Sequence, residues 1–310
     1  MKSIYKYIVC VCTALAATSC DFLDVVPDNV ATEEHAFADR YTVEKYLASC
    51  YWRVPKAASM SENPGIHGAM EMILNTEYSG DTGMKLGLGQ DSPTSALMNY
   101  WASSYSLYAG IRDCNTFMMG IGDVKDLDEY EKKRMIAEVK MLKAYFHFYL
   151  LSYYGPICPL RESPAVNEST QAVRVYREKV DDCFSYVLDL MDEVIESEAL
   201  PLILSNPTTE LGRFTQPAAY MLKAKILLYW ASPLFNGNTD YNSFRDHNGE
   251  PFFNQTYDAS RWTTAAEACK KAVDICETAG IRLYRTSDYI SAKKLSDQTL
   301  QVQTLRGVIS

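Results

Sequence analysis

The chain has 310 residues, of which 47% are hydrophobic, and it carries a formal net charge of −9. This length and apolar content are sufficient for a large buried core in one or two domains. Because an acidic protein gains nothing from contacts with phosphate, the charge argues against a nucleic-acid partner. The 22 Tyr and four Trp residues supply many aromatic rings that also carry a hydrogen-bonding group.

The N-terminus has the pattern of a bacterial lipoprotein signal peptide. Lys2 and Lys6 precede an apolar run that is too short to span a bilayer comfortably. Small residues then lead to Cys20, as in the lipobox, where the cysteine thiol is diacylated and becomes the new N-terminus. Ordinary cleavage near Ala17, which would leave Cys20 as a free thiol, is the alternative. We expect lipidation of Cys20, which would anchor the chain in a membrane.

Apolar residues recur at helical spacing in six stretches, and no run reads convincingly as a β-strand. The helices predicted from this spacing cover residues 42–53, 95–120, 128–154, 175–198, 216–232 and 262–279. Long segments rich in Gly, Pro, Asn and Asp separate several of them. The sequence therefore predicts an all-α fold with long inserted loops.

The helix over residues 128–154 is the longest of these. Asp128 and Glu131 have the spacing of a capping box, and Gly155 followed by a proline provides the end. From 144 to 151 the helix is apolar almost all round, so other helices should surround it. His147 lies in this part and is expected to be a core histidine with its hydrogen bonds satisfied.

Several segments of the chain resemble the SusD/RagB family of outer-membrane nutrient-binding lipoproteins from Bacteroidetes. The central helix matches the signature of that family, with Lys143 where the family usually has Arg. The matching residues there are Ala137, Glu138, Leu142, Ala144, Tyr145, Phe148, Leu150, Tyr154, Gly155, Pro159 and Leu160. The start after Cys20, the helix around Asn115, the Gly212–Thr215 segment and the helix from Trp262 also match.

The resemblance implies a helical-repeat core of the tetratricopeptide type on a surface-exposed, lipid-anchored outer-membrane protein. Such a protein captures a nutrient, usually an oligosaccharide, and passes it to a TonB-dependent transporter of the SusC type. Neither a cofactor nor a metal is implied.

The expected organisation has four parts. Residues 1–19 are a signal peptide, 20–40 a lipidated tether, 41–285 the SusD-like helical domain, and 286–310 a poorly packed tail. Members of the family are typically much longer, so the C-terminal subdomain is expected to be missing.

The loop before the second predicted helix is the first candidate for glycan contacts. Sugars need flat aromatic faces beside side chains that form hydrogen bonds with hydroxyls. The candidate residues are Asn75, Tyr78, Asp81, Asn99, Tyr100 and Trp101. For Trp101, a role as a core anchor is equally compatible with the sequence. The loop 236–257 is a second candidate, or it covers the core.

The sequence contains no HExxH, GxSxG or Walker motif, so an enzyme is not expected. The cysteines after Cys20 are scattered without CxxC pairs, and buried free thiols are expected rather than a disulfide or metal site. Two alternatives to the glycan-binding function stay open. One is a helical-repeat scaffold lipoprotein that binds proteins, and the other is a peptide-binding member of the same family.

Overall fold

The computed structural model describes residues 33–56, 85–86, 88–92, 94–103, 106–164, 168–171 and 173–283, together with positions 298 and 302. Within these residues the regular structure is helical, and β-structure is confined to two isolated bridges. The helices are α2 (Glu33–Ala36), α3 (Arg40–Trp52), α7 (Leu107–Gly120), the 3-10 helix η2 (Ile121–Asp123), α8 (Glu129–Tyr154), α9 (Val180–Glu196), α10 (Pro207–Glu210), α11 (Gln216–Ala231) and α12 (Ser260–Thr278). The all-α prediction is confirmed.

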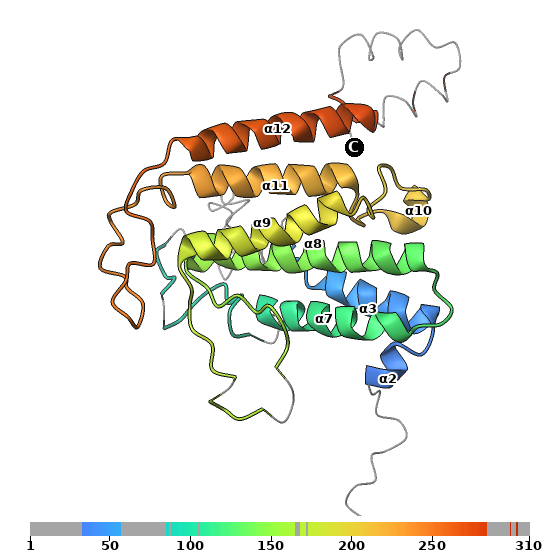
Figure 1. Cartoon of the computed structure of the whole chain (residues 1–310), viewed down its shortest axis with the longest axis horizontal. Coiled ribbons are helices and arrows are strands. Elements are labelled where there is room, and N and C mark those ends of the chain that lie inside the picture. Colours follow the sequence, from blue (N-terminus) through green and yellow to red (C-terminus); the bar gives the residue numbers. More distant parts are fainter. Residues whose placement is uncertain are drawn as a thin grey trace, which may run out of the picture.

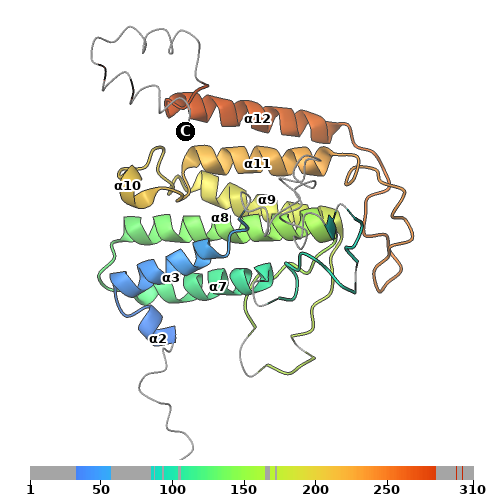
Figure 2. The same cartoon turned by 180° about the vertical axis from the view of Figure 1, so that it is seen from behind.

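Helices that follow one another in the chain also lie side by side in space. The rods α7, α8, α9, α11 and α12 form a stack in sequence order (Figure 1), and α3 packs on both α7 and α8 (Figure 2). This arrangement is the one expected of a tetratricopeptide-like repeat, in which each helical unit covers the apolar face of its neighbour. Long connections gather where α8 and α11 end and α9 and α12 begin.

The central helix α8 begins and ends as its sequence predicts. The Asp128 carboxylate accepts a hydrogen bond from the Glu131 N–H (2.8 Å), and the Glu131 carboxylate accepts one from the Asp128 N–H (3.2 Å). These reciprocal bonds satisfy two of the free N–H groups at the helix start. At the other end Gly155 has a φ of 67°, a conformation that side chains with a Cβ rarely adopt.

The core is formed where α8 meets its neighbours. Phe117, Phe146 and Phe184 are fully buried, and they come from α7, α8 and α9 respectively. Gly110 lets α7 approach closely, because a Cβ there would lie 2.9 Å from the Phe146 ring. A methyl group at that position would force the two helices apart.

His147 is buried on α8 and both of its ring nitrogens are hydrogen-bonded. Its Nε2 accepts from the Leu160 N–H (3.1 Å), so Nδ1 is the protonated nitrogen and donates to the Lys143 carbonyl (2.8 Å). Burial lowers the pKa of His147 from 6.5 to about 3, which keeps the ring neutral. The prediction of a satisfied core histidine is confirmed.

Two predicted helix starts are wrong. The helix predicted from residue 95 begins at Leu107, where the Ser106 hydroxyl caps it by accepting from the Ala109 N–H (3.2 Å). The helix predicted from residue 175 begins at Val180. The residues before Val180 are extended because their N–H groups bond to carbonyls that are distant in the sequence. The Glu178 N–H, for example, donates to the Ile157 carbonyl (2.8 Å). Tertiary hydrogen bonds replace the first helical turn in this second case.

Candidate functional site

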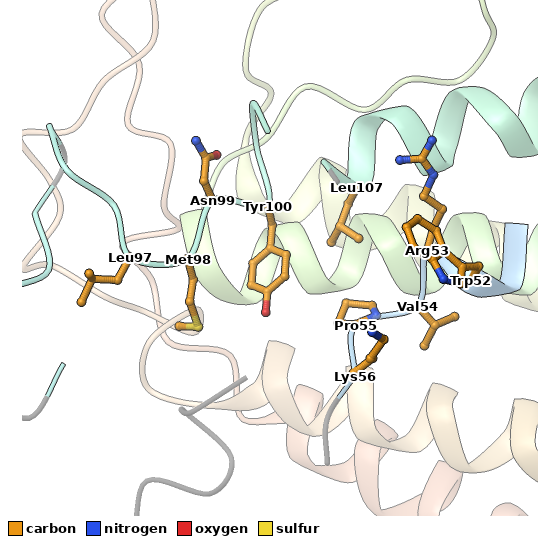
Figure 3. A pocket seen from close by; sticks show the side chains of 10 residues that line it. All are labelled: Trp52, Arg53, Val54, Pro55, Lys56, Leu97, Met98, Asn99, Tyr100 and Leu107. Atoms are coloured by element: carbon orange, nitrogen blue, oxygen red, sulfur yellow. The ribbon is translucent and has the colours of Figure 1, made fainter. Parts of the chain in front are cut away.

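An open cavity of about 420 Å³ lies between the end of α3 and the segment that precedes α7. Figure 3 shows its lining side chains, which come from two short stretches and from the first residue of α7. They are Trp52, Arg53, Val54, Pro55, Lys56, Leu97, Met98, Asn99, Tyr100 and Leu107. We call this space the α3 cavity. Its volume is within the range of cavities that hold small ligands in other proteins.

Asn99 fixes the backbone of the turn on one side of the α3 cavity. Its side-chain oxygen accepts hydrogen bonds from the Trp101 N–H (3.2 Å) and the Ala102 N–H (2.8 Å). The Ser103 hydroxyl donates to the Asn99 carbonyl (2.7 Å). This is an Asx turn, the local alternative to a helix that asparagine favours. It explains why the chain is not helical here, and the amide nitrogen of Asn99 is not used by the turn.

Tyr100 is held by a group of tyrosines on α8. Its backbone N–H donates to the Tyr154 hydroxyl (3.0 Å), and its ring lies edge-on to the rings of Tyr149 (5.3 Å between centroids) and Tyr153 (5.2 Å). Tyr149 and Tyr153 stack on each other at 5.0 Å. Such edge-to-face and offset-stacked pairs are favourable geometries for aromatic rings. Tyr100 is thus positioned in advance of any ligand.

Two tyrosines of this group, Tyr153 and Tyr154, are neutral at physiological pH because burial raises the pKa of each. Burial, followed by the hydrogen bond between Tyr153 and Tyr149, raises the pKa of Tyr153 well above its usual value. Burial also raises the pKa of Tyr145, which lies one turn before Tyr149 on the same face of α8. Neutral phenols can donate hydrogen bonds to a ligand as well as accept them.

Trp101 is not among the residues that line the α3 cavity, and its ring packs between other rings. It lies edge-on to Tyr108 (5.1 Å) and to Tyr154 (5.3 Å), and the Arg177 guanidinium lies 4.6 Å from its ring centroid. The Tyr108 hydroxyl in turn accepts from the Cys158 N–H (3.0 Å). Of the two roles open for Trp101, these contacts favour the core anchor.

The structure therefore separates the predicted glycan-contact residues. Asn99 and Tyr100 line the α3 cavity, whereas Trp101 does not line it and packs against Tyr154. Asn75, Tyr78 and Asp81, like the predicted lipidation site Cys20, lie outside the described residues.

The second candidate loop, residues 236–257, covers the core. Phe252 and Phe253 are buried, and Phe253 stacks on Phe235 (6.2 Å). The Asn236 amide nitrogen donates to the Asp258 carbonyl (2.8 Å), and its oxygen accepts from the Asp258 N–H (2.8 Å). These contacts tie the two ends of the loop together, so the structure supports its covering role.

The sequence reasoning missed the wall of the α3 cavity that α3 provides. Trp52 is 57% exposed although it is one of only four tryptophans in the chain. Trp52 falls outside the apolar stripe of α3. A large apolar ring on the polar face of a helix is a signal that could have identified Trp52 as a binding residue. Next to it, the Arg53 guanidinium pairs with Asp113 on α7 (3.0 Å).

A second cavity of about 380 Å³ adjoins the first and shares Val54 with it. Its other lining residues include Tyr145 on α8, and Phe214 and Leu222 near and on α11. Because Tyr145, Tyr149 and Tyr153 follow one another at four-residue steps, one tyrosine stripe on α8 runs from this second cavity toward Tyr100. The two cavities can accommodate an elongated ligand with repeated units.

Neither a membrane-spanning helix nor a metal site occurs among the residues that the structure describes. None of the described helices combines the length and the apolar character needed to cross a bilayer. No group of three or more His, Cys, Asp and Glu side chains there could hold a metal ion.

Several solved structures have a fold similar to that of this chain. The protein named BT4246 superposes with a TM-score of 0.68 at 24% identity, covering 88% of this chain and 48% of that one. A SusD homolog from Bacteroides thetaiotaomicron VPI-5482 matches with a TM-score of 0.55 at 16% identity, covering 83% and 50%. Surface glycan-binding protein A from Bacteroides uniformis matches with a TM-score of 0.51 at 20% identity, covering 78% and 46%. The chain spans about half of the length of these relatives.

Comparison with curated protein sequences finds no match. A family model, by contrast, matches residues 21–228, which is more than half of the chain. That family is described as starch-binding and associating with the outer membrane. The description concerns binding, in agreement with the prediction that the protein is not an enzyme. From the match and the shared fold, we conclude that this chain belongs to the SusD-like family.

Proposed function

We propose that this protein is a lipoprotein of the outer membrane that binds an oligosaccharide at the cell surface and delivers it to a SusC-like TonB-dependent transporter. Cys20 would carry the lipid. The family description supports binding of a glycan and association with the outer membrane. Relatives named as a surface glycan-binding protein and as a SusD-like carbohydrate-binding protein share the fold.

The observation that carries the proposal is the α3 cavity, with its aromatic and hydrogen-bonding lining. Trp52 and Tyr100 offer flat apolar surfaces that can cover the C–H face of a sugar ring. Asn99, Arg53 and Lys56 offer N–H groups that can meet its hydroxyl oxygens. A site for a small ligand usually has an apolar wall with a small number of precisely placed polar groups.

The second cavity extends this site along a glycan chain. A polysaccharide presents the same ring at regular intervals, so a row of aromatic faces suits it better than a single deep pocket. Tyr145 in the second cavity and Tyr100 in the α3 cavity each provide such a ring, and the buried Tyr149 contacts both of them. Because the tyrosines contact one another, little side-chain entropy would be lost on binding.

Binding without chemistry is sufficient for the proposed role. A capture protein must hold its ligand and then release it to a transporter, so moderate affinity suits it. The α3 cavity is open to solvent and has walls from two separate stretches of chain, which permits entry of an internal part of a long glycan.

The test is titration calorimetry of the purified chain against a panel of neutral polysaccharides. Trp52→Ala should reduce affinity for the glycan that binds by tenfold or more, about 1.4 kcal/mol. Trp262→Ala is the matched control, because Trp262 is also partly exposed (42%) but lies on α12, away from both cavities. Equal losses in the two variants, or binding to none of the polysaccharides, would contradict the proposal.

Delivery to a transporter needs a separate experiment. Pull-down of the tagged, lipidated chain from its native outer membrane should recover a TonB-dependent transporter. Recovery of other proteins in its place, without retention of the chain on immobilised polysaccharide, would favour the scaffold alternative. A peptide-binding relative would recover the transporter but fail to bind any polysaccharide.

A further inference from the structure

A third cavity lies at the end of the stack where α3 and α8 begin, beside the short helix α10 (Figure 2). Its volume is about 910 Å³, and it is open to solvent. We call it the charged cavity, because three arginines and four acidic residues are among the side chains that line it.

The charged cavity adjoins the cavities of the proposed glycan site. It shares Tyr51 and Gly212 with the second cavity, and the second cavity shares Val54 with the α3 cavity. A row of three adjoining cavities therefore follows α3 from its first residue to its end. At about 1.5 Å per residue, the 13 residues of α3 make this row roughly 20 Å long.

One face of α3 borders both ends of this row. Arg40, Glu44 and Ala48 line the charged cavity, and Trp52 lines the α3 cavity. Residues at four-residue steps lie on the same face of a helix, so these four side chains form a single ridge. Ala48 is the smallest of them and is exposed, so it leaves room for a ligand to pass along the ridge.

The charges in the charged cavity are already paired with one another. The Glu131 carboxylate accepts two hydrogen bonds from the Arg40 guanidinium (2.5 and 2.6 Å). Arg134 and Arg213 both pair with Glu210, at 2.7 and 3.3 Å. A charged ligand would have to displace one member of a pair. A neutral ligand with hydroxyl groups avoids this cost, because one hydroxyl can donate to a carboxylate and accept from a guanidinium at the same time.

The charged cavity also offers apolar surface and a hydrogen-bond donor. Tyr130 on α8 and Leu211 after α10 line it and are 61% and 85% exposed. An exposed tyrosine ring can cover the C–H face of a sugar. The Nη2 nitrogen of Arg134 is buried and has no hydrogen-bond partner among the residues that the structure describes. A ligand hydroxyl reached by a small shift of this side chain would supply the missing acceptor.

We propose that the charged cavity is a second binding position for a neutral glycan chain, which runs along α3 from the α3 cavity to Tyr130. This inference rests on the proposed function, because it needs a glycan in the α3 cavity. When one chain occupies both ends, the second contact is intramolecular, so affinity rises with chain length although each contact alone is weak. The protein would thereby select long polymers over short fragments.

The first test is calorimetry with a trisaccharide and an octasaccharide of the same neutral polymer. The polymers are starch, laminarin, xylan and mannan. For the polymer that binds, the octasaccharide should bind wild type at least tenfold more tightly than the trisaccharide does. Tyr130→Ala should remove this gain with length. Tyr41→Ala should keep it and is the matched control, because Tyr41 is similarly exposed (65%) but is not among the residues that line the three cavities.

The outcomes separate this inference from the proposed function. If Trp52→Ala weakens binding while Tyr130→Ala leaves the gain with length unchanged, the α3 cavity binds glycan and the charged cavity does not. Absence of any gain in wild type would also overturn the inference. If none of the four polymers binds, both proposals fail. If Tyr130→Ala prevents recovery of the transporter but retains the gain, the charged cavity is a protein-contact surface instead.

A second test places an obstacle along the ridge and keeps the Tyr130 ring. Ala48→Arg puts a long side chain beside the charged cavity, whereas Ser49→Arg puts the same side chain on the next exposed position, which is not among the lining residues. Both variants should fold, because neither position is buried. Only Ala48→Arg should lose the tenfold preference for the octasaccharide. The same preference in both variants would contradict a glycan path along α3.

Discussion

The two halves of α8 are held by different kinds of interaction. In the first half, the fully buried Glu138 carboxylate accepts hydrogen bonds from Tyr51 (2.8 Å), Arg134 (3.2 Å) and Arg213 (2.8 Å). Glu210 pairs with the same two arginines from the far side. This network of charges connects α3, α8 and the loop before α11 and fixes their relative positions.

The second half of α8 is held by aromatic rings. Tyr149, Tyr153 and Tyr154 contact Tyr100 and Trp101 from the turn before α7. Ring contacts tolerate small shifts in distance and angle, whereas buried ion pairs require their full set of hydrogen bonds. The comparison teaches that the charged half fixes the fold through a complete set of hydrogen bonds, while the aromatic half positions Tyr100 at the α3 cavity.

Removal of the central charge should cause the largest effect. Glu138→Gln keeps the side-chain shape but leaves the Arg134 and Arg213 guanidinium groups partly buried beside a neutral group. We expect a loss of about 3–5 kcal/mol in the free energy of unfolding, measured by urea denaturation. Glu193→Gln is the control, because its pair with Lys140 is exposed and should cost under about 1 kcal/mol. Similar losses in both variants would mean that the Glu138 network contributes little.

Acid should lower the stability of the protein through His147, which lies in the second half of α8. The pKa of His147 is 6.5 in an unfolded chain and about 3 when folded. Below pH 6.5 the unfolded state therefore binds more protons, and stability is lost as pH falls toward 3. This group alone should account for about 3 kcal/mol by pH 4.

The check is a pH series of urea denaturation with wild type and His147→Gln. The variant is less stable at pH 7 but should lose less between pH 7 and pH 4 than wild type does. Parallel curves would show that His147 does not titrate between the folded and unfolded states in this range.

Removal of one ring from the aromatic half of α8 should cost less stability than removal of the Glu138 charge. Trp101→Ala deletes the contacts with Tyr108, Tyr154 and Arg177, and we expect a loss of about 2–3 kcal/mol in unfolding free energy. Trp262→Ala, on the outer helix α12, should cost under about 1 kcal/mol. If Trp101→Ala instead reduced glycan affinity in calorimetry without any change in stability, Trp101 would be a ligand contact and not an anchor.

The smallest expected effect comes from replacing the side-chain amide of Asn99. Asn99→Asp keeps the oxygen that accepts from the Trp101 and Ala102 N–H groups, so the turn and its stability should be retained. It replaces the amide N–H donor with a carboxylate oxygen, and affinity for a neutral glycan should fall about tenfold. Asn99→Ala should lower affinity and stability together. Unchanged affinity in Asn99→Asp would exclude the amide donor from binding.

Local signals allowed the central part of the fold to be predicted. The α8 boundaries follow from the Asp128–Glu131 capping box and from Gly155, each of which acts within a few residues. By contrast, the residues before Val180 carry a helical pattern, but the Glu178 N–H donates to the Ile157 carbonyl and the Val180 N–H donates to the Phe252 carbonyl. No local signal reveals such distant partners, so the predicted helix was too long.

The candidate site was predicted in part for the same reason. The turn residues Asn99 and Tyr100 were identified from composition and from the family resemblance. Their separation from Trp101 depends on the direction of each side chain, which follows from contacts with α8. Trp52 was missed because its role depends on the approach of a segment more than forty positions away.

The Tyr51 hydroxyl also accepts a hydrogen bond from the Phe214 N–H (3.0 Å), although 163 positions separate the two residues. Contacts over such sequence distances slow folding, because a long loop must close before the contact forms. Helix α3 therefore cannot complete its packing until the chain beyond Arg213 is available. Hydrogen exchange on chains ending before residue 212 should find α3 unprotected. A protein made from its N-terminus onward would thus complete the packing of α3 only after residue 214 had been synthesised.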